Sequence, residues 1–282
     1  MSSRVAVVTD STASLPLDVL ERFGIIVVPL SVVIGGQVFD DGSEATASDV
    51  ATALRSWTPV STSRPSPAAL LAAYEKAQAD GADAVVSIHL SAAMSGTFDS
   101  AVLAAKSAPL PVQAVDSRSL GMALGYSVVS AAAVAAESAD LDAVVDAAVR
   151  RARETSSLFY VDTLEYLRRG GRIGAAQALI GSALAVKPLL HVKDGKIAPL
   201  EKVRTSSRAL SRLEDLAVER AGAGPVDAAV HHLASSVRAE QLAAGLRARL
   251  PHLVELSVSE VGAVVGAHVG PGMVAVVVAP RG

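Results

Sequence analysis

The sequence contains no cysteine, and this absence excludes several kinds of chemistry at once. A chain without cysteine has no disulfide, no thiolate-bound zinc or iron–sulfur cluster, and no cysteine nucleophile. Aromatic residues make up only 3% of the 282 residues, which leaves few flat side chains for stacking against bases or sugars. The formal net charge of -3 supplies no general attraction for nucleic acid or acidic lipid. We therefore expect no nucleic-acid partner.

Long uninterrupted hydrophobic runs are also missing. Residues 119–136 are rich in Ala, Ser and Gly, and residues 261–279 contain a histidine, a proline and four glycines. Neither segment suits a membrane-spanning helix, which needs about 20 consecutive apolar residues. The opening residues, MSSRVAVVTD, lack the charged and apolar regions of a signal peptide. We therefore expect a cytoplasmic protein without stable membrane insertion.

The residues that are present suit a folded protein with a large apolar core. Hydrophobic residues make up 51% of the chain and charged residues 19%, which is typical of a globular protein. The apolar residues are mainly Ala, Val and Leu, so they suit an aliphatic ligand as well as a plain core. A length of 282 residues is sufficient for two domains.

The first half of the chain alternates apolar runs with helical stretches. Strands are predicted at residues 5–9, 25–30, 84–88 and 112–115. Helices are predicted after Ser95 and over residues 122–136. Strands that are apolar throughout and alternate with helices indicate a parallel sheet with helices on both faces. We therefore expect an α/β domain over residues 1–155.

The second half has a different pattern. An Asp-Gly pair at residues 194–195, flanked by two apolar runs, predicts a β-hairpin with a type I′ turn. Helices are predicted over residues 206–221 and 236–250, and strands at 226–230, 254–258 and 273–278. This mixture favours a separate α+β domain, for which we expect the bounds 156–282.

Hydroxyl-rich loops recur in the sequence. They comprise residues 10–12, 61–66, 91–97 and 116–117. Three of them directly follow predicted strands, and ligand sites of α/β sheets form where loops leave the carboxyl ends of the strands. Helix capping uses the same residue types, so a single loop decides nothing, whereas the set of four favours a binding site.

The familiar enzyme motifs are absent. No segment supplies the phosphate-binding P-loop or a metal-binding H-E-x-x-H. Residues 270–275 fit the dinucleotide fingerprint by letter, but they lead into a predicted strand instead of a helix. Ser95 lies in AMSGT, which lacks both glycines of the G-x-S-x-G nucleophile elbow. We therefore expect no catalytic residue and no metal ligand.

Several segments, in order along nearly the whole chain, resemble the DegV family, which includes the fatty-acid-binding subunits of bacterial fatty acid kinase. The segments are VAVVTDSTASLP at residues 5–16, TSRPSP at 62–67, LS and SGT within 90–97, VDS at 115–117, LEYLRRGGRI at 164–173, KP at 187–188, VRT at 203–205 and HVGPG at 268–272. One departure is Arg64, where the family often has Gln.

The resemblance implies two domains with a ligand tunnel at their junction. It implies a long-chain fatty acid as the ligand, presented to a separate kinase catalytic subunit that phosphorylates the carboxylate, and no other cofactor. The residues that the resemblance assigns to the carboxylate are Thr62, Ser63, Ser95, Gly96, Thr97 and His268. Those that it assigns to the kinase encounter are Arg172 and Arg204. We expect a monomer.

Two other functions stay open. A serine esterase would use Ser95 as the nucleophile and His268 as the base, with Asp116 orienting the histidine. An interaction protein would hold lipid only as a structural element. Some of these residues also fit purely structural roles. His268 fits a loop histidine that packs against glycines. The arginines of residues 168–172 likewise fit a solvated helix end.

Overall fold

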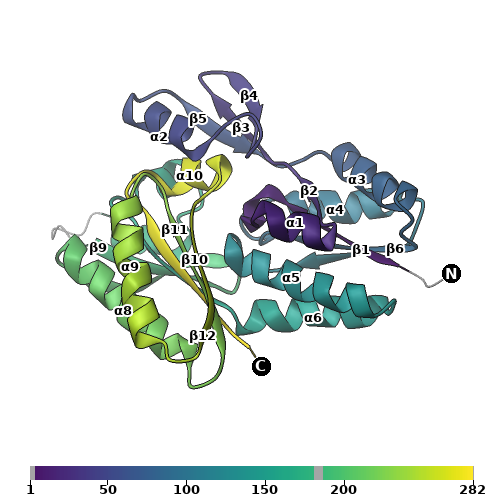
Figure 1. Ribbon diagram of the computed structural model, residues 1–282. Helices are drawn as coiled ribbons and strands as arrows, with labels where there is room; N and C mark the ends of the chain where they lie inside the picture. Colours follow the sequence, from purple (N-terminus) through teal and green to yellow (C-terminus); the bar gives the residue numbers. More distant parts are fainter. Residues whose placement is uncertain (1–3, 181–186, 282) are drawn as a thin grey trace. The chain divides into compact units, whose positions relative to one another are not determined.

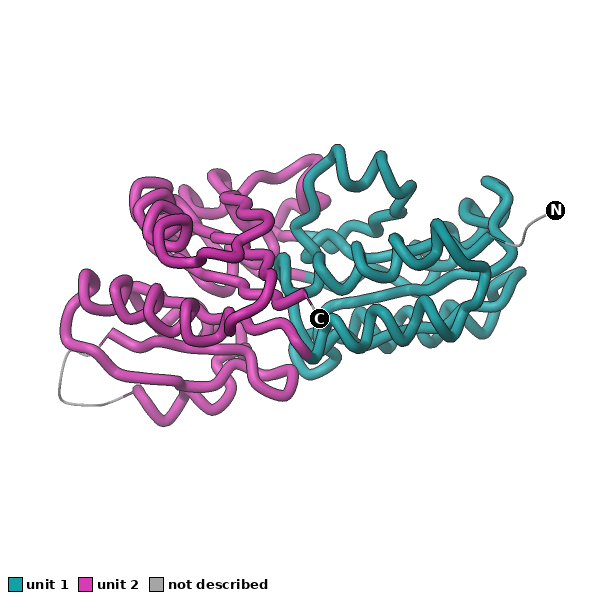
Figure 2. Tube along the Cα trace, turned by 60° about the horizontal axis from the view of Figure 1, so that its bottom comes forward, with its two compact units in different colours: residues 1–31, 63–153 teal, residues 32–62, 154–282 magenta. Residues whose placement is uncertain are grey.

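The computed structural model describes residues 4–180 and 187–281, which fold into two compact units. Figure 2 shows unit 1, residues 1–31 and 63–153, and unit 2, residues 32–62 and 154–282. The chain therefore enters unit 2, returns to unit 1 and enters unit 2 again. This differs from the expected continuous domain of residues 1–155, because residues 32–62 belong to the second unit.

Unit 1 contains a four-stranded parallel sheet in the order β2-β1-β6-β7. Its strands are β1 (Val5–Asp10), β2 (Ile26–Val28), β6 (Ala84–His89) and β7 (Val112–Asp116). All residues of β1 are buried, as expected for a strand that has helices on both of its faces. The predicted parallel α/β sheet is confirmed.

Helices cover both faces of this sheet. The helical elements of unit 1 are η1 (Ser11–Ala13), α1 (Leu17–Phe23), α3 (Pro67–Ala79), α4 (Thr97–Ala105), α5 (Met122–Glu137) and α6 (Leu141–Glu154). Figure 1 shows α3 and α4 on one side of β1 and β6, and α5 on the other side. Ser66 caps α3 and Pro67 occupies its first turn. The core beneath α3 and α4 includes Leu70, Tyr74 and Val85.

Unit 2 contains a six-stranded mixed sheet in the order β10-β9-β8-β13-β11-β12, in which only β11 and β12 pair in parallel. Its strands are β8 (Ser156–Tyr160), β9 (Lys187–Lys193), β10 (Lys196–Val203), β11 (Val226–His232), β12 (Leu253–Glu260) and β13 (Val274–Pro280). Asp194 and Gly195 connect β9 to β10 with φ angles of 51° and 76°. Both angles are positive, as the predicted type I′ turn requires.

The helices of unit 2 are α2 (Ala47–Arg55), α7 (Glu165–Arg169), α8 (Ser206–Ala221), α9 (Ser236–Arg249) and α10 (Ala263–Val269), together with the 3₁₀ helix η2 (Gly174–Leu179). Helices α8 and α9 lie side by side on one face of the six-stranded sheet (Figure 1). Their apolar residues form a core with the strands that includes Leu213, Leu246 and Val276.

The segment of residues 32–62 supplies a second, smaller sheet. Strands β3 (Ser31–Ile34), β4 (Gln37–Asp40) and β5 (Val60–Ser63) pair in the order β4-β3-β5. Helix α2 begins with a capping box between Thr46 and Asp49 and packs against α10. The Asp41 carboxylate accepts a hydrogen bond from Val264 N, 3.2 Å away, at the start of α10. These contacts explain why the segment belongs to unit 2. Within the described ranges, no helix is long and apolar enough to cross a membrane.

Candidate functional site

Thr62 and His268 form a hydrogen-bonded pair in unit 2. The distance from Thr62 Oγ1 to His268 Nε2 is 2.8 Å. Thr62 lies near the end of β5, and His268 lies in the last turn of α10, not in the loop that the sequence suggested. The two residues are separated by 206 positions in the sequence, so the fold alone brings them together.

The imidazole of His268 packs against a residue that has no side chain. Gly170, which ends α7, lies directly against the ring, and a Cβ at this position would collide with His268 Nδ1. Nδ1 is buried and has no hydrogen-bond partner among the described residues. Burial, together with the nearby charge of Arg172, lowers the pKa of His268 to about 4. The imidazole is therefore neutral at pH 7 and interacts through Nε2.

The two arginines assigned to the kinase encounter have different surroundings. Arg172 is half-buried, and its Nη1 donates a hydrogen bond to the carbonyl oxygen of Gly170 at 2.6 Å. It therefore acts on the turn that holds His268. Arg204, directly after β10, is exposed and forms no hydrogen bond or ion pair with the residues that the structure describes. Of the two, Arg204 has the freer side chain.

A second group of hydroxyls lies in unit 1, at the start of α4. The Oγ atoms of Ser95 and Thr97 are 2.9 Å apart. Gly96 is the N-cap of α4 and has no side chain to accept from the first amides of the helix. Hydroxyls and amide groups at a helix N-terminus can donate to an anion. Ser63, also assigned to the carboxylate, is exposed at the end of β5, and its hydroxyl has no partner among the described residues.

A buried hydrogen-bond network supports the ends of β1 and β6. The Asp10 carboxylate lies 2.9 Å from His89 Nδ1 and accepts a hydrogen bond from Leu90 N at 3.0 Å. His89 Nε2 lies 2.7 Å from Ser87 Oγ, to which the Tyr74 hydroxyl donates at 2.9 Å. An acid, a histidine and a serine in this order resemble a catalytic triad. However, all three are 0% exposed, so no substrate reaches Ser87 and the network is structural.

From the sequence, Asp10 was expected only as a loop residue, and His89 was not singled out. The sequence feature that could have indicated this network is a polar residue directly after each of two apolar runs, Asp10 after residues 5–9 and His89 after residues 84–88. Asp116, the residue proposed to orient a catalytic histidine, accepts hydrogen bonds from Ala92 N and Arg118 N instead. It therefore connects the loop of residues 91–97 to the loop after β7. Ser95 pairs with Thr97, and His268 pairs with Thr62.

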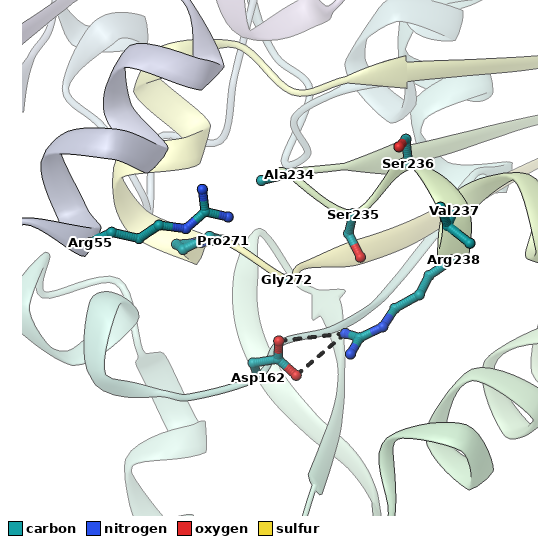
Figure 3. A pocket seen from close by; sticks show the side chains of 9 residues that line it. All are labelled: Arg55, Asp162, Ala234, Ser235, Ser236, Val237, Arg238, Pro271 and Gly272. Carbon is teal, nitrogen blue, oxygen red and sulfur yellow. Dashed lines mark hydrogen bonds and ion pairs between the residues drawn. The ribbon is translucent and has the colours of Figure 1, made fainter.

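Unit 2 also contains a concave polar pocket of about 490 Å³, shown in Figure 3. Its lining residues are Arg55, Asp162, Ala234, Ser235, Ser236, Val237, Arg238, Pro271 and Gly272. Asp162 and Arg238 form an ion pair across it at 3.4 Å. These charged and hydroxyl groups suit a polar ligand and do not suit an acyl chain. No group of three His, Asp or Glu side chains within residues 4–180 and 187–281 is arranged to hold a metal ion.

A family model described as "Uncharacterised protein, DegV family" matches residues 4–281. The chain belongs to the DegV family. A DegV domain-containing protein of Streptomyces coelicolor is 56% identical over 281 residues, which cover 100% of each chain.

Solved DegV structures have the same fold. A DegV family protein from Thermus thermophilus, described as binding fatty acid, has a TM-score of 0.94 at 34% identity, covering 99% of this chain and 100% of that one. DegV from Bacillus subtilis, described as a fatty-acid-binding protein, has a TM-score of 0.91 at 34% identity with the same coverage. The predicted family and the predicted two-domain α/β architecture are therefore confirmed. The assignment of individual site residues stays a prediction.

Proposed function

We propose that this DegV protein binds a long-chain fatty acid and presents the carboxylate to a separate kinase. Two whole-chain structural matches at 34% identity are described as fatty-acid-binding. The observation within this chain that carries the proposal is the Thr62–His268 pair, a hydroxyl and a neutral imidazole 2.8 Å apart. When Nε2–H of the neutral imidazole donates to Thr62 Oγ1, the Thr62 hydroxyl is left to donate a hydrogen bond to a carboxylate without supplying a full charge.

The acyl chain accounts for most of the binding free energy in this proposal. A C16 fatty acid buries about 14 methylene groups at roughly 0.8 kcal/mol each, or about 11 kcal/mol before the cost of association. The headgroup site therefore sets the orientation of the ligand more than its affinity. The tunnel that would hold the chain stays a prediction.

The headgroup residues fall into two groups, one in each unit. In unit 2, we assign the carboxylate to Thr62 and His268, where the neutral imidazole orients the Thr62 hydroxyl through Nε2 and that hydroxyl is the donor. In unit 1, the proposed donors are the hydroxyls of Ser95 and Thr97 and the amides at Gly96. We assign Ser63 to the same role because its hydroxyl is exposed at the end of β5. Variants of each group test the two assignments separately.

The proposed reaction belongs to the kinase. A carboxylate oxygen attacks the terminal phosphorus of a nucleoside triphosphate, the bond to the bridging oxygen breaks, and the nucleoside diphosphate leaves with that electron pair. The product is an acyl phosphate. Neutral donors leave more negative charge on the attacking oxygen than a bidentate arginine clamp would leave. The DegV protein itself orients the nucleophile and supplies no catalytic group.

We assign the kinase encounter to the arginines. Arg204 is exposed and unpaired among the described residues, so it is available to an acidic surface of the partner. Arg172 is a second contact through the part of its side chain that stays exposed, while Nη1 holds Gly170. Arginines at the rim of an interface mainly raise the association rate and fix the orientation of the partner.

Mass spectrometry of lipids extracted from the denatured protein tests the binding step first. We expect one fatty acid per chain, of roughly C14–C18. An empty extract, repeated after incubation with palmitate, would overturn the binding proposal. The presentation step is tested with the cognate kinase subunit and a nucleoside triphosphate. If palmitate binds and no acyl phosphate forms, presentation is wrong and binding stands. The esterase alternative requires hydrolysis of a p-nitrophenyl ester that disappears in Ser95→Ala.

A further inference from the structure

Arg64 in unit 1 is an arginine without a protein partner. It follows Thr62 by two residues in the chain and precedes Pro65. Its side chain is exposed, and it forms no hydrogen bond or ion pair with any residue in the ranges 4–180 and 187–281. The guanidinium lies directly against Gly96, the N-cap of α4.

The absence of a side chain at Gly96 lets the Arg64 guanidinium approach the start of α4. Gly96 has φ and ψ angles of -77° and 15°, which other residues also adopt, so the backbone does not require glycine here. A Cβ at position 96 would collide with the Arg64 guanidinium, which is the flexible end of an exposed side chain and would have to move. A larger residue at position 96 would therefore displace Arg64 from the start of α4.

The position of Arg64 is electrostatically unfavourable unless an anion is present. The N-terminus of a helix carries partial positive charge, and a cation beside it is repelled. The side chains nearest in sequence to Gly96 are the hydroxyls of Ser95 and Thr97, which carry no charge. Asp99 in the first turn of α4 forms no ion pair with Arg64. A guanidinium, two hydroxyls and helix amides together attract a single anionic group.

We propose that Arg64 is a specificity-determining residue of the proposed fatty-acid site, which makes the site select an ionised carboxylate over a neutral headgroup on the same acyl chain. This inference rests on the proposed function. An exposed guanidinium attracts an anion through partly hydrated space and needs no bidentate clamp to do so. The contribution is therefore modest and sensitive to salt.

Two probes with the same chain length isolate the headgroup. Palmitate is the anionic probe and 1-hexadecanol is the neutral one. We expect Arg64→Gln to weaken palmitate binding by about fivefold at low salt and by less than about twofold at 1 M salt, with hexadecanol binding unchanged. Arg64→Lys should retain most of the palmitate affinity. The matched control is Arg150→Gln, which removes an exposed arginine of α6 that is unpaired within the part of the chain that the structure describes. It should change neither affinity.

Gly96→Ala is a second variant, which keeps the charge of Arg64 and displaces its guanidinium from the start of α4. We expect it to weaken palmitate binding as Arg64→Gln does, and to add little in the Arg64→Gln background, because the two changes remove the same interaction. Melting temperatures check that each variant is folded. Equal losses for both probes, or no loss for either, would overturn the role of Arg64 while leaving the proposed function intact. Wild-type protein that bound neither probe would overturn both.

Discussion

The two groups of candidate headgroup residues are held in place by different physical means. In unit 1, the loop that carries Ser95 follows strand β6, whose end is fixed by the buried network of Asp10 and His89. In unit 2, the turn that carries His268 is fixed by glycines that allow close approach. Buried hydrogen bonds position the group in unit 1, and close packing against glycines positions the group in unit 2. The position of the first group should therefore be lost when a buried polar atom is removed. The position of the second group should be lost when a side-chain carbon is added at one of the glycines.

Glycine contacts recur between two segments of unit 2. Gly170 lies against His268, Gly270 against Tyr166, and Gly272 against Asp162. In each case a Cβ would collide with the opposing side chain. The segment of residues 162–170 and the segment of residues 268–272 thus interlock. A displacement of either segment would move His268.

The largest expected effect is on the buried network of unit 1. Asp10→Ala should lower the free energy of unfolding by about 3–5 kcal/mol, because it leaves His89 and the amide of Leu90 buried without their acceptor. Denaturant unfolding measures this loss. Asp146→Asn changes an exposed residue of α6 that has no partner among the described residues, and as the control it should change stability by less than about 0.5 kcal/mol. If Asp10→Ala lowered the free energy of unfolding by as little as the control does, the network would not stabilise unit 1.

The next effect is on the glycine contact of unit 2. Gly170→Ala should lower the free energy of unfolding by about 1–3 kcal/mol through overpacking, and weaken palmitate binding by displacing His268. Calorimetric titration with palmitate measures the affinity. Gly224→Ala is the control, because a Cβ there would meet nothing within 4 Å. Undiminished affinity in Gly170→Ala would show that the position of His268 does not matter for binding.

The neutral state of His268 should appear in the pH dependence of stability. The pKa of His268 is about 4 in the folded protein and 6.5 ordinarily, so the unfolded chain binds more protons between these values. Stability should therefore fall as the pH falls from 6.5 to 4. His231, whose burial also lowers its pKa to about 4, contributes in the same direction. Proton NMR of wild type and His268→Gln assigns the resonance of His268. Titration of that resonance near 6.5 would contradict the neutral imidazole.

The smallest effects on stability should come from the two arginines. Arg204→Ala should slow acyl-phosphate formation with the kinase by about tenfold while changing palmitate affinity by less than twofold, because an exposed arginine acts at the partner interface. Arg172→Gln should affect the kinase step and also raise the pKa of His268 by removing a nearby cation. Identical phenotypes for the two variants would contradict the difference in their surroundings.

Local patterns were sufficient to predict part of this structure. The buried strands of unit 1 follow from apolar runs, and the β9–β10 hairpin follows from Asp194-Gly195, because these features depend on neighbouring residues. The hydroxyl-rich loop that contains Ser95 and Thr97 was recognised for the same reason, whereas the role of these two residues at the carboxylate came from the family resemblance. The division at residue 155 missed the segment 32–62, because its short strands carry no signal of the unit that they join.

The group in unit 2 could not be predicted from local patterns. The resemblance to a family suggested Thr62 and His268, and no spacing in the sequence indicates that they meet. His268 was expected in a loop because glycines surround it, and it lies in α10. A glycine shows that space is needed. It does not show which distant side chain fills that space, so the contact between Gly170 and His268 was not predicted.

The path of the chain between the units has a consequence for biosynthesis. Helix α2 packs against α10, and Asp41 bonds to Val264, which is 223 positions later. The segment of residues 32–62 therefore leaves the ribosome long before its packing partner is synthesised. Until then its apolar surface is available to chaperones or to other nascent chains. Truncation near residue 155 would leave that segment permanently without a partner, so fragments of this protein should aggregate where the full chain folds.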